Sequence, residues 1–238
     1  MRIGILSDIH GNIDALNAVL KHAEKLKVET FFILGDLVGY YLDPEKVIQR
    51  IRTLSNTTTI QGNHERFLIQ VLNGTKDIHE LNNKYGEGHQ LALQKLNAGE
   101  LDWLAELPIE KNMMFDGLSI KLCHGAPGHP DMYLYPDTKK EIMIELFNEE
   151  HDFIFVGHSH YPFIIPRNNC VLINVGSVGM SKDVGGLASW GLLDTSNRTF
   201  IPHRTPYNTD RLANAITNSE NLNSDYLVSL LTRNRYDK

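Results

Sequence analysis

Cysteine is scarce in this sequence. Its 238 residues include two, Cys123 and Cys170, which form neither a CxxC pair nor a disulfide framework. Disulfides persist mainly in oxidising compartments, so this composition favours a reducing one. Cys123 directly precedes His124 in an apolar run, where strand alternation points the two side chains to opposite faces. We therefore expect Cys123 in the core and not in a reactive site.

Long apolar runs are missing as well. No run approaches the roughly 18 residues that a membrane span needs. The opening apolar stretch, residues 3–6, is soon followed by Asp8, which is not typical of a signal peptide. We therefore expect a cytoplasmic protein that does not contact a membrane.

Positive charge is in short supply. Lys and Arg number 23 against 29 Asp and Glu, which gives a formal net charge of -6. A broad nucleic-acid-binding surface usually needs a basic face, so the composition argues against such a surface. A small phosphorylated substrate is still compatible with it, because bound divalent metals would reverse the local field.

The first part of the chain alternates short apolar runs with helical patterns. Residues 3–6, 31–34 and 58–60 are predicted strands. Asn12 is suited to cap a helix after the first strand, and Pro44 is typical of the first position of another helix. This alternation favours a layered α/β fold.

The later part of the chain is richer in strands. Asp116-Gly117 predicts a hairpin turn between two of them. Predicted strands cover residues 109–115, 118–122, 153–156, 163–165, 171–175, 188–193 and 199–203, and predicted helices cover residues 138–147 and the stretch after Asn208. That C-terminal stretch packs either on its own domain or on a second subunit, which leaves a homo-oligomer open.

No internal repeat, low-complexity segment or linker divides the chain, so we expect a single domain over residues 1–238. Between the predicted strands, residues 64 to about 106 have a mostly helical pattern. Two interpretations of this segment are equally compatible with its pattern. It either forms a helical cap over a site or serves plain helical packing.

Polar side chains follow five of the predicted strands, most of them beside a glycine. They are Asp8 and His10, Asp36, Asn63 with His64, His124, and His158 with His160. In layered α/β folds, ligand sites lie at the carboxyl ends of strands. We therefore expect these side chains to converge on one site.

Carboxylate, carboxamide and imidazole groups together are a metal-ligand set. Mixed oxygen and nitrogen ligands suit manganese, iron, zinc, cobalt or nickel better than magnesium or calcium, with manganese or iron favoured. The seven expected ligands are Asp8, His10, Asp36, Asn63, His124, His158 and His160. Seven are too many for one catalytic centre and fit two divalent metals that share a carboxylate.

Two metals about 3.5–4 Å apart form a clamp for in-line displacement at phosphorus and generate a bridging hydroxide near neutral pH. Such a centre also needs an acid for the leaving alkoxide. His64 follows an expected ligand, Asn63, and is not needed to complete either coordination shell, so it is our candidate. The remaining histidines are expected to be surface or packing residues: His22, His79, His89, His129, His151 and His203.

Several aromatic residues lie near the predicted strand ends: Tyr40, Tyr41, Tyr133, Tyr135 and Tyr161. They either form aromatic walls for an aryl or nucleobase group or pack at the strand ends. The second interpretation is slightly favoured by the sequence alone.

The ordered motifs D-x-H, G-D, G-N-H-E, H-G and G-H-S-H resemble the calcineurin-like metallophosphoesterase family, from Met1 to about His203. More narrowly, Gly35 to Pro44 and the turn Asn174 to Gly179 are similar to its small bacterial and archaeal phosphodiesterase-like branch. The resemblance implies two mixed β-sheets packed face to face with helices outside, a four-layer sandwich. It also implies hydrolysis of phosphate esters.

The family pattern divides the expected ligands into two shells. One metal would take Asp8, His10, Asp36 and His160, and the other would take Asp36, Asn63, His124 and His158. Asp36 would bridge the two metals. His64 would be the acid or transition-state donor, and Glu65 would orient it.

The chain departs from the protein serine/threonine phosphatases in two places. Gln61 stands where those enzymes have an arginine before GNHE, and residues 35–39 lack their aspartate-arginine-glycine. The absence of these clamping arginines favours phosphodiesters or dinucleoside polyphosphates. A phosphomonoesterase that uses Arg66 or Lys182, a protein phosphatase, and a non-catalytic scaffold of the same fold stay as alternatives.

Overall fold

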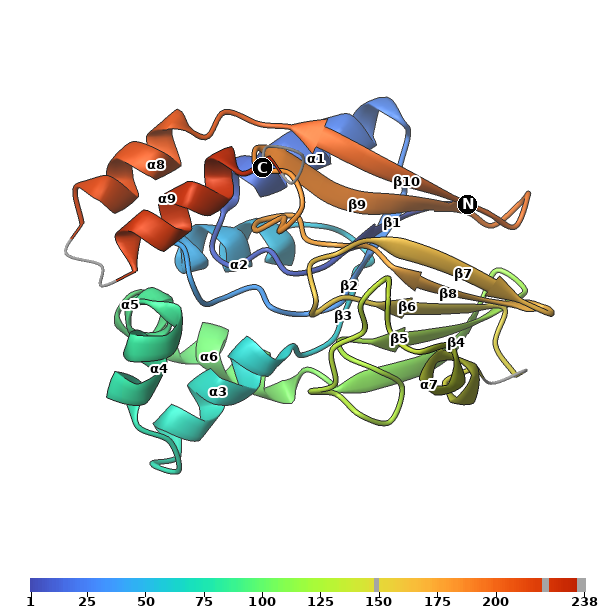
Figure 1. Ribbon diagram of the computed structural model, residues 1–238, viewed down its shortest axis with the longest axis horizontal. Helices are drawn as coiled ribbons and strands as arrows, with labels where there is room; N and C mark the ends of the chain where they lie inside the picture. Colours follow the sequence, from blue (N-terminus) through green and yellow to red (C-terminus); the bar gives the residue numbers. More distant parts are fainter. Residues whose placement is uncertain (148–149, 220–222, 235–238) are drawn as a thin grey trace.

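The computed structural model describes residues 1–147, 150–219 and 223–234, and shows two mixed β-sheets with helices outside (Figure 1). In the first sheet, the strands follow the order β10 (Thr199–Pro206), β9 (Leu187–Asp194), β1 (Arg2–Leu6), β2 (Thr30–Ile33) and β3 (Thr58–Thr59). In the second, the order is β4 (Glu110–Phe115), β5 (Leu118–Cys123), β6 (Phe153–Val156), β8 (Cys170–Asn174) and β7 (Phe163–Arg167).

The two sheets bury one apolar layer between them. Ile3 and Ile5 of β1 belong to the same buried cluster as Leu122 of β5 and Phe155 of β6. Residues i and i+2 of a strand face the same side, so these alternating positions turn toward the opposite sheet. The expected face-to-face packing of two mixed sheets is confirmed.

Helices cover the outer face of each sheet. Helix α1 (Ile13–Lys25) begins where the side chain of Asn12 accepts a hydrogen bond from Ala15 N. Its buried residues share a cluster with β9 residues, and helix α2 (Pro44–Arg52) contributes to the same cluster. On the second sheet, Met143 of α7 (Lys140–Glu145) packs against residues of β6 and β8. The order of layers is therefore helix, sheet, sheet, helix.

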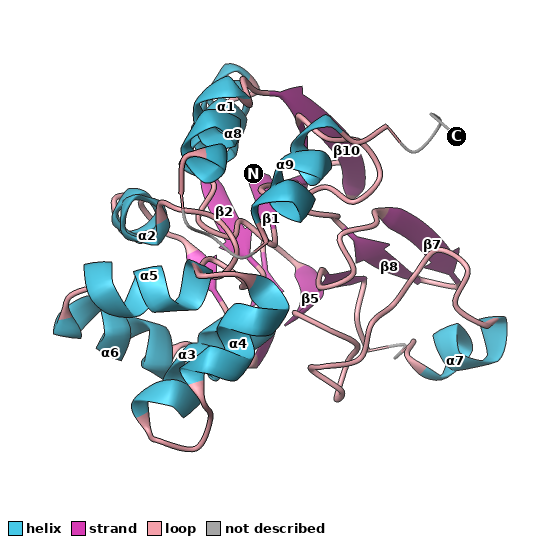
Figure 2. Ribbon diagram, turned by 60° about the vertical axis from the view of Figure 1, so that its left-hand side comes forward, coloured by secondary structure: helices cyan, strands magenta, loops and turns pink. Residues whose placement is uncertain are grey.

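Four short helices fill the segment between β3 and β4, as the sequence predicted. They are α3 (Asn63–Leu72), α4 (Ile78–Tyr85), α5 (Gly88–Lys95) and α6 (Ala98–Glu106). Figure 2 shows them grouped on one side of the sheets, away from α7. Helix α5 contacts both α2 and α3, which anchors the group to the body of the fold.

The C-terminal helices pack on the chain's own domain. They are α8 (Asp210–Thr217) and α9 (Ser224–Thr232). Leu212 and Leu227 share a buried cluster with Tyr41 and Met180. The remainder of the predicted C-terminal stretch, residues 220–222 and 235–238, lies outside the described residues. None of the helices in the described part of the chain combines the length and apolarity that a bilayer crossing requires.

Candidate metal centre

The polar side chains predicted to converge follow strands that run parallel. Strands β1, β2 and β3 are parallel in one sheet, and β5, β6 and β8 in the other. Backbone hydrogen bonds join the loops that follow them: Asp8 N donates to Gly35 O at 3.0 Å, and Gly157 N donates to His124 O at 2.9 Å. His158 N then donates to Asp8 Oδ2 at 3.0 Å, which links the loops of the two sheets.

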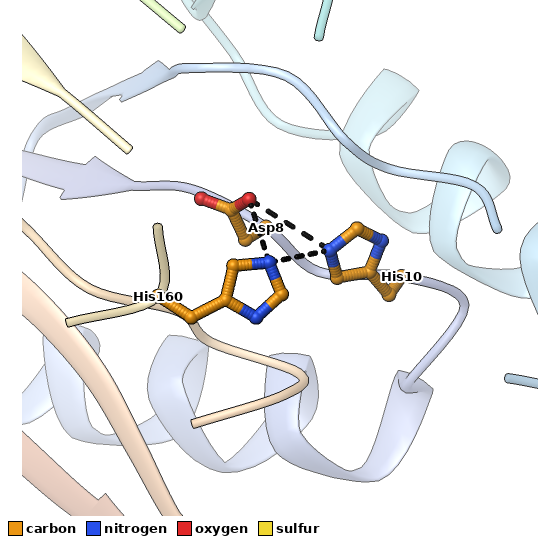
Figure 3. Close-up of side chains that lie close together, drawn as sticks. All are labelled: Asp8, His10 and His160. Carbon is orange, nitrogen blue, oxygen red and sulfur yellow. Dashed lines mark hydrogen bonds and ion pairs between the residues drawn. The ribbon is translucent and has the colours of Figure 1, made fainter. Parts of the chain in front are cut away.

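One half of the site consists of Asp8, His10 and His160 (Figure 3). His160 Nε2 lies 3.2 Å from Asp8 Oδ1, and His10 Nε2 lies 3.7 Å from it. Asp8 Oδ1 is buried and makes no hydrogen bond within the described residues. A buried carboxylate oxygen without a donor costs free energy unless a cation meets it. This orphan oxygen, beside two imidazole nitrogens, fits a bound metal.

The other half is built around Asp36, His124 and His158. His124 Nε2 lies 3.2 Å from Asp36 Oδ2 and 3.0 Å from Asn63 Oδ1. Asp36 Oδ2 also lies 3.7 Å from His10 Nε2 in the first half. Asp36 therefore lies between the two groups and faces both.

Most of the histidines present one ring nitrogen to the site and anchor the other to a backbone carbonyl. Nδ1 of His10 contacts Val38 O at 3.1 Å, that of His124 contacts Leu34 O at 2.7 Å, and that of His160 contacts Met180 O at 2.7 Å. A carbonyl only accepts, so Nδ1 carries a proton in each of these rings, and in a neutral ring the lone pair is then on Nε2. In His158 it is Nε2 that contacts a carbonyl, Asp131 O at 3.3 Å.

The backbone at this site adopts a conformation that side chains rarely take. The affected residues are Asp8 (φ 56), His10 (φ 51), Asp36 (φ 55), His158 (φ 65) and His160 (φ 65). A positive φ is uncommon outside glycine, and such residues cluster at functional sites, where the surrounding structure enforces them. The shared conformation marks these five positions as one built site.

Two glycines explain the G-N-H and G-H-S-H motifs. A Cβ atom on Gly62 would lie 2.1 Å from Asp36 Oδ1, and one on Gly157 would lie 2.0 Å from Ser7 Oγ and 2.5 Å from Asp8 Oδ2. Any side chain at either position would displace a carboxylate of the site. These motifs therefore let the backbone approach Asp8 and Asp36 directly.

The turn Asn174 to Gly179 hydrogen-bonds to the backbone of Asp8. Ser177 Oγ donates to Asp8 O at 2.7 Å, and Gly179 N donates to the same oxygen at 3.0 Å. Gly179 O in turn accepts from Asn12 Nδ2 at 2.8 Å. The turn thus fixes both the backbone of Asp8 and the start of α1.

Burial and the two carboxylates set the charges of the histidines. Burial lowers the pKa of both His158 and His160, each to about 4. Burial also disfavours the imidazolium form of His124, but Asp36 and Asp8 outweigh it and raise the pKa of His124 to about 9. Burial alone would raise the pKa of Asp36, yet the neighbouring histidines, His124 foremost, hold it well below its usual range. Without metal, the imidazolium of His124 therefore offsets part of the negative charge of the two buried carboxylates.

His64 lies beside this cluster, in the first turn of α3. Its Nε2 is 4.0 Å from Asp36 Oδ2, and its Nδ1 is 3.1 Å from His89 Nε2. His10, Asp36 and His64 also lie close enough together to form a ligand group of their own. Geometry alone therefore leaves His64 two roles, as a hydrogen-bond donor or as a ligand.

Glu65 differs from the sequence expectation. Its carboxylate accepts from Asp36 N at 2.8 Å, from Leu37 N at 2.7 Å and from Gly62 N at 2.8 Å. Its hydrogen bonds within the described residues go to backbone amides and not to the His64 ring. Because these amides lie in and beside the loop that carries Asp36, Glu65 orders that loop.

Sequence reasoning missed one neighbour of the site, His89, and left the roles of two others, Tyr133 and Arg66, open. His89 was expected to be a surface or packing residue, but it is fully buried and contacts His64. Tyr133 stacks on His158 with ring centroids 3.7 Å apart. Arg66 forms an ion pair with Asp131. None of the three follows a strand, so the signal that identified the other residues does not apply to them.

Comparisons with known proteins agree with this geometry. Residues 1–198 match the calcineurin-like phosphoesterase superfamily domain. The chain is 34% identical over 210 residues to uncharacterized protein MJ0912 of Methanocaldococcus jannaschii, which covers 81% of this chain and 82% of that protein. It is similar to the metallophosphoesterase from Sphaerobacter thermophilus at 26% identity and a TM-score of 0.77, over 97% of this chain and 98% of that one.

The hypothetical protein PH1004 from Pyrococcus horikoshii OT3 shares the fold, with a TM-score of 0.82, 21% identity and coverage of 98% of each chain. The match over residues 1–198 and the relative at 34% identity decide the family. The chain belongs to the calcineurin-like phosphoesterase superfamily, and it is a hydrolase of phosphoric ester bonds.

Proposed function

We propose that this protein is a binuclear metallophosphoesterase. The observation that carries the proposal is the position of Asp36, whose Oδ2 lies 3.2 Å from His124 Nε2 and 3.7 Å from His10 Nε2. Its other oxygen, Oδ1, accepts from His64 N at 2.9 Å. That bond fixes the carboxylate so that Oδ2 faces both ligand groups, as a bridging ligand requires.

The proposed ligands fall into two sets that share Asp36. One metal takes Asp8, His10, Asp36 and His160, and the other takes Asp36, Asn63, His124 and His158. Oxygen and imidazole donors without a thiolate suit manganese, iron, zinc, cobalt or nickel, and we favour manganese or iron. When bound, such metals lower the pKa of a coordinated water and neutralise phosphate oxygens.

In this proposal, His64 donates a hydrogen bond to the leaving group. Burial lowers the pKa of His64 well below its ordinary value, so the ring is neutral near pH 7. A neutral ring with its proton on Nε2 donates a hydrogen bond to the oxygen on which charge develops as the P–O bond breaks. Glu65 acts indirectly, by holding the backbone amides around Asp36.

We further propose that the helical segment, residues 64–106, covers one side of the site within a single domain over residues 1–238. Tyr85 on α4 and His89 on α5 place their rings 4.9 Å and 4.8 Å from the ring of His64. These contacts support the cap interpretation of the segment over plain packing.

For the substrate, we propose a phosphodiester or a dinucleoside polyphosphate. Tyr133 and Tyr135 are 43% and 37% exposed, and Tyr135 lines a hollow of about 500 Å³ with Tyr161. Exposed aromatic rings beside a proposed ligand, His158, suit the planar group of a nucleotide ester. Tyr41, in contrast, is fully buried and packs in the core.

The supply of cationic side chains near the site also affects which substrate is expected. Arg66 is engaged by Asp131, so its charge is already balanced. Gln61, which stands where protein phosphatases have an arginine, donates to Leu104 O at 2.8 Å and serves to fasten α6. Both observations disfavour a protein phosphatase and a strongly clamped monoester.

Lys182 is the specific observation that favours a phosphomonoesterase as the second candidate. Burial lowers the pKa of its ammonium, while Asp8 and Asp36 attract its charge. A cation that both carboxylates attract is suited to a phosphate dianion. The sequence alternative of a non-catalytic scaffold is disfavoured, because all seven ligand positions and His64 are filled.

A substrate panel tests the proposal. Purified protein is loaded in turn with Mn, Fe, Co, Ni, Zn and Mg, and hydrolysis of phosphomonoesters, phosphodiesters and dinucleoside polyphosphates is measured. We expect turnover of diesters or dinucleoside polyphosphates with a transition metal. No turnover on any substrate with any metal would refute the enzymatic proposal in favour of a scaffold.

The variant Lys182→Ala separates the two enzymatic candidates, with Lys182→Arg as the charge-preserving control. A diesterase should keep its kcat/KM for diesters in both variants. A monoesterase should lose kcat/KM for monoesters in Lys182→Ala and recover much of it in Lys182→Arg.

We also propose a cytoplasmic location. Cys123 and Cys170 are both free thiols buried in the core. Free buried cysteines are in keeping with a reducing compartment. Fractionation of native cells that express the protein with a redox-insensitive tag would test the location.

A further inference from the structure

Two imidazole rings from different helices meet beside the proposed metal centre. His64 Nδ1 on α3 lies 3.1 Å from His89 Nε2 on α5, and the two ring planes are 8° apart. Both side chains are buried. The second nitrogen of His89, Nδ1, is buried and has no hydrogen-bond partner in the described chain.

The backbone is built to bring these rings together. A Cβ atom on Gly88 would lie 2.1 Å from Tyr40 N, and one on Gly39 would lie 2.2 Å from His64 Nδ1. Glycine at position 88 lets the start of α5 rest directly on the loop at Tyr40, and glycine at position 39 leaves room in that loop for the His64 ring. Close packing of the main chain therefore brings the His64 and His89 side chains within hydrogen-bond distance.

Two proton arrangements satisfy the contact between two neutral rings. In the first, His89 Nε2–H donates to His64 Nδ1, so His64 carries its proton on Nε2. In the second, His64 Nδ1–H donates to His89 Nε2, so His89 carries its own proton on the unpartnered Nδ1. Burial lowers the pKa of His89 to about 4, in keeping with a neutral ring.

The surroundings favour the first arrangement. The second would leave a buried N–H without an acceptor, which folded proteins avoid more strictly than an unused acceptor. It would also turn the lone pair of His64 Nε2 toward Asp36 Oδ2, 4.0 Å away, where two acceptors would face each other. The first arrangement has neither defect.

We propose that His89 is a positioning residue, which donates its Nε2–H to His64 Nδ1 and so holds His64 in the tautomer with a proton on Nε2. That tautomer makes His64 a hydrogen-bond donor toward the substrate oxygens. It excludes His64 as a metal ligand through Nε2, because that nitrogen has no free lone pair. The inference rests on the proposed function only for the use that His64 makes of this proton.

The tautomer is measured by long-range ¹H–¹⁵N NMR of the imidazole rings, in metal-free and zinc-loaded protein, with His64→Ala to assign the signals. We expect His64 to carry its proton on Nε2 in both states, and His89→Leu to lose this preference. A His64 protonated on Nδ1 in the wild type would overturn the inference. Because this readout needs no turnover, it stands apart from any failure of the enzymatic proposal.

Steady-state kinetics of two matched variants of His89 test whether its hydrogen bond to His64 supports turnover. The amide nitrogen of glutamine reaches about as far as His Nε2, so His89→Gln keeps a donor, whereas His89→Leu keeps only bulk. We expect His89→Leu to lose about 10–100-fold in kcat, as is usual when a residue that orients an active-site side chain is removed. Its KM and metal content should stay close to wild type. His89→Gln should retain most of the activity.

Equal losses in the two variants would show that His89 serves packing alone, and wild-type kcat in His89→Leu would show that it serves no role in turnover. Either result refutes the positioning role. If the wild type hydrolyses no ester while the NMR result holds, the enzymatic proposal fails and the tautomer assignment survives.

Discussion

Among single residues, Asp36 combines the most roles in the site. Its backbone N–H donates to Glu65, its Oδ1 accepts from His64 N, and its Oδ2 faces His124. Its φ of 55 is strained for a residue with a side chain. The position of Asp36 therefore depends on contacts from two sheets and one helix. Together these contacts orient its Oδ2 atom.

Asp36→Asn tests this role with little change of shape. The amide oxygen still accepts from His64 N, but the charge shared by the two ligand groups is lost. We expect kcat/KM to fall by more than the factor of about 10–100 that is typical when a residue that only orients a metal ligand is replaced. The metal content should also be lower. Metal analysis and kinetics measure both effects, with circular dichroism as the control for folding. Wild-type metal content and rate would contradict the bridging assignment.

His124 gives the metal-free protein a distinctive dependence on pH. Its pKa is raised to about 9 from an ordinary value of 6.5, so the folded chain binds a proton more tightly than the unfolded chain. This stabilisation is complete below pH 6.5 and is lost as pH rises through about 9. His158 and His160, with pKa values lowered to about 4, act in the opposite direction and only below pH 6.5.

We therefore expect the unfolding free energy of the metal-free protein to fall between pH 6.5 and 9, and this fall to be smaller in His124→Gln. Urea unfolding across this range measures the difference between the two proteins. Saturating zinc should remove the fall, because the metal replaces the proton. Parallel pH profiles for the wild type and the variant would rule out the raised pKa.

At the scale of elements, the site depends on how closely strand ends and helix starts approach. Gly62 caps the start of helix α3 and lies against Asp36, and helix α5 begins at Gly88, which rests on the loop at Tyr40. These two helices deliver Asn63, His64 and His89 to the site. A side chain at either helix start would shift the whole element.

Gly62→Ala tests the first of these contacts. Its Cβ would lie 2.1 Å from Asp36 Oδ1, and overpacking of this kind costs about 1–3 kcal/mol of unfolding free energy. We expect lower stability and weaker metal binding, measured by urea unfolding and metal titration. Gly99→Ala in α6 is the matched control, since its nearest neighbour would be 3.5 Å away and a helical alanine stabilises. Equal effects of the two substitutions would argue against the close approach.

Much of the fold could be predicted because its signals are local. The cap at Asn12, the proline at the start of α2 and the Asp116-Gly117 turn act over a few residues, and all three appear in the structure. The predicted helix at residues 138–147 is shorter, Lys140–Glu145. Thr138 instead forms a turn, in which Tyr135 N donates to its Oγ1 at 2.8 Å.

The parts of the site that the sequence could not predict depend on distant contacts. A polar residue after an apolar run marks a strand end, so the convergence of Asp8, Asp36 and His158 was predictable. The role of His89 was not, because it lies within a helix whose position is set by packing. Glu65 was assigned to the His64 ring by analogy, but the amides at residues 36–38 compete for its carboxylate and bind it.

For the whole molecule, the proposed ligands come from segments far apart in the chain, from Asp8 to His160. Only the folded state brings them together, so a metal at the proposed site would bind the native state in strong preference to the unfolded chain. The C-terminal helices contribute as well, because they bury Met180, whose carbonyl anchors His160 Nδ1. Metal affinity and global stability are therefore coupled.

We expect metal loading to raise the unfolding free energy, by about 2.7 kcal/mol when free metal is 100-fold above its Kd. Calorimetry with manganese or zinc, followed by a chelator, measures the rise and its reversal. Leu227→Ala, which opens the buried cluster beneath Met180, should lower stability by about 2–5 kcal/mol and also weaken the binding of metal. Asp36→Asn is the control for binding outside the site, and its metal-induced shift should be much smaller. A shift of equal size in Asp36→Asn would place the stabilising metal elsewhere on the protein.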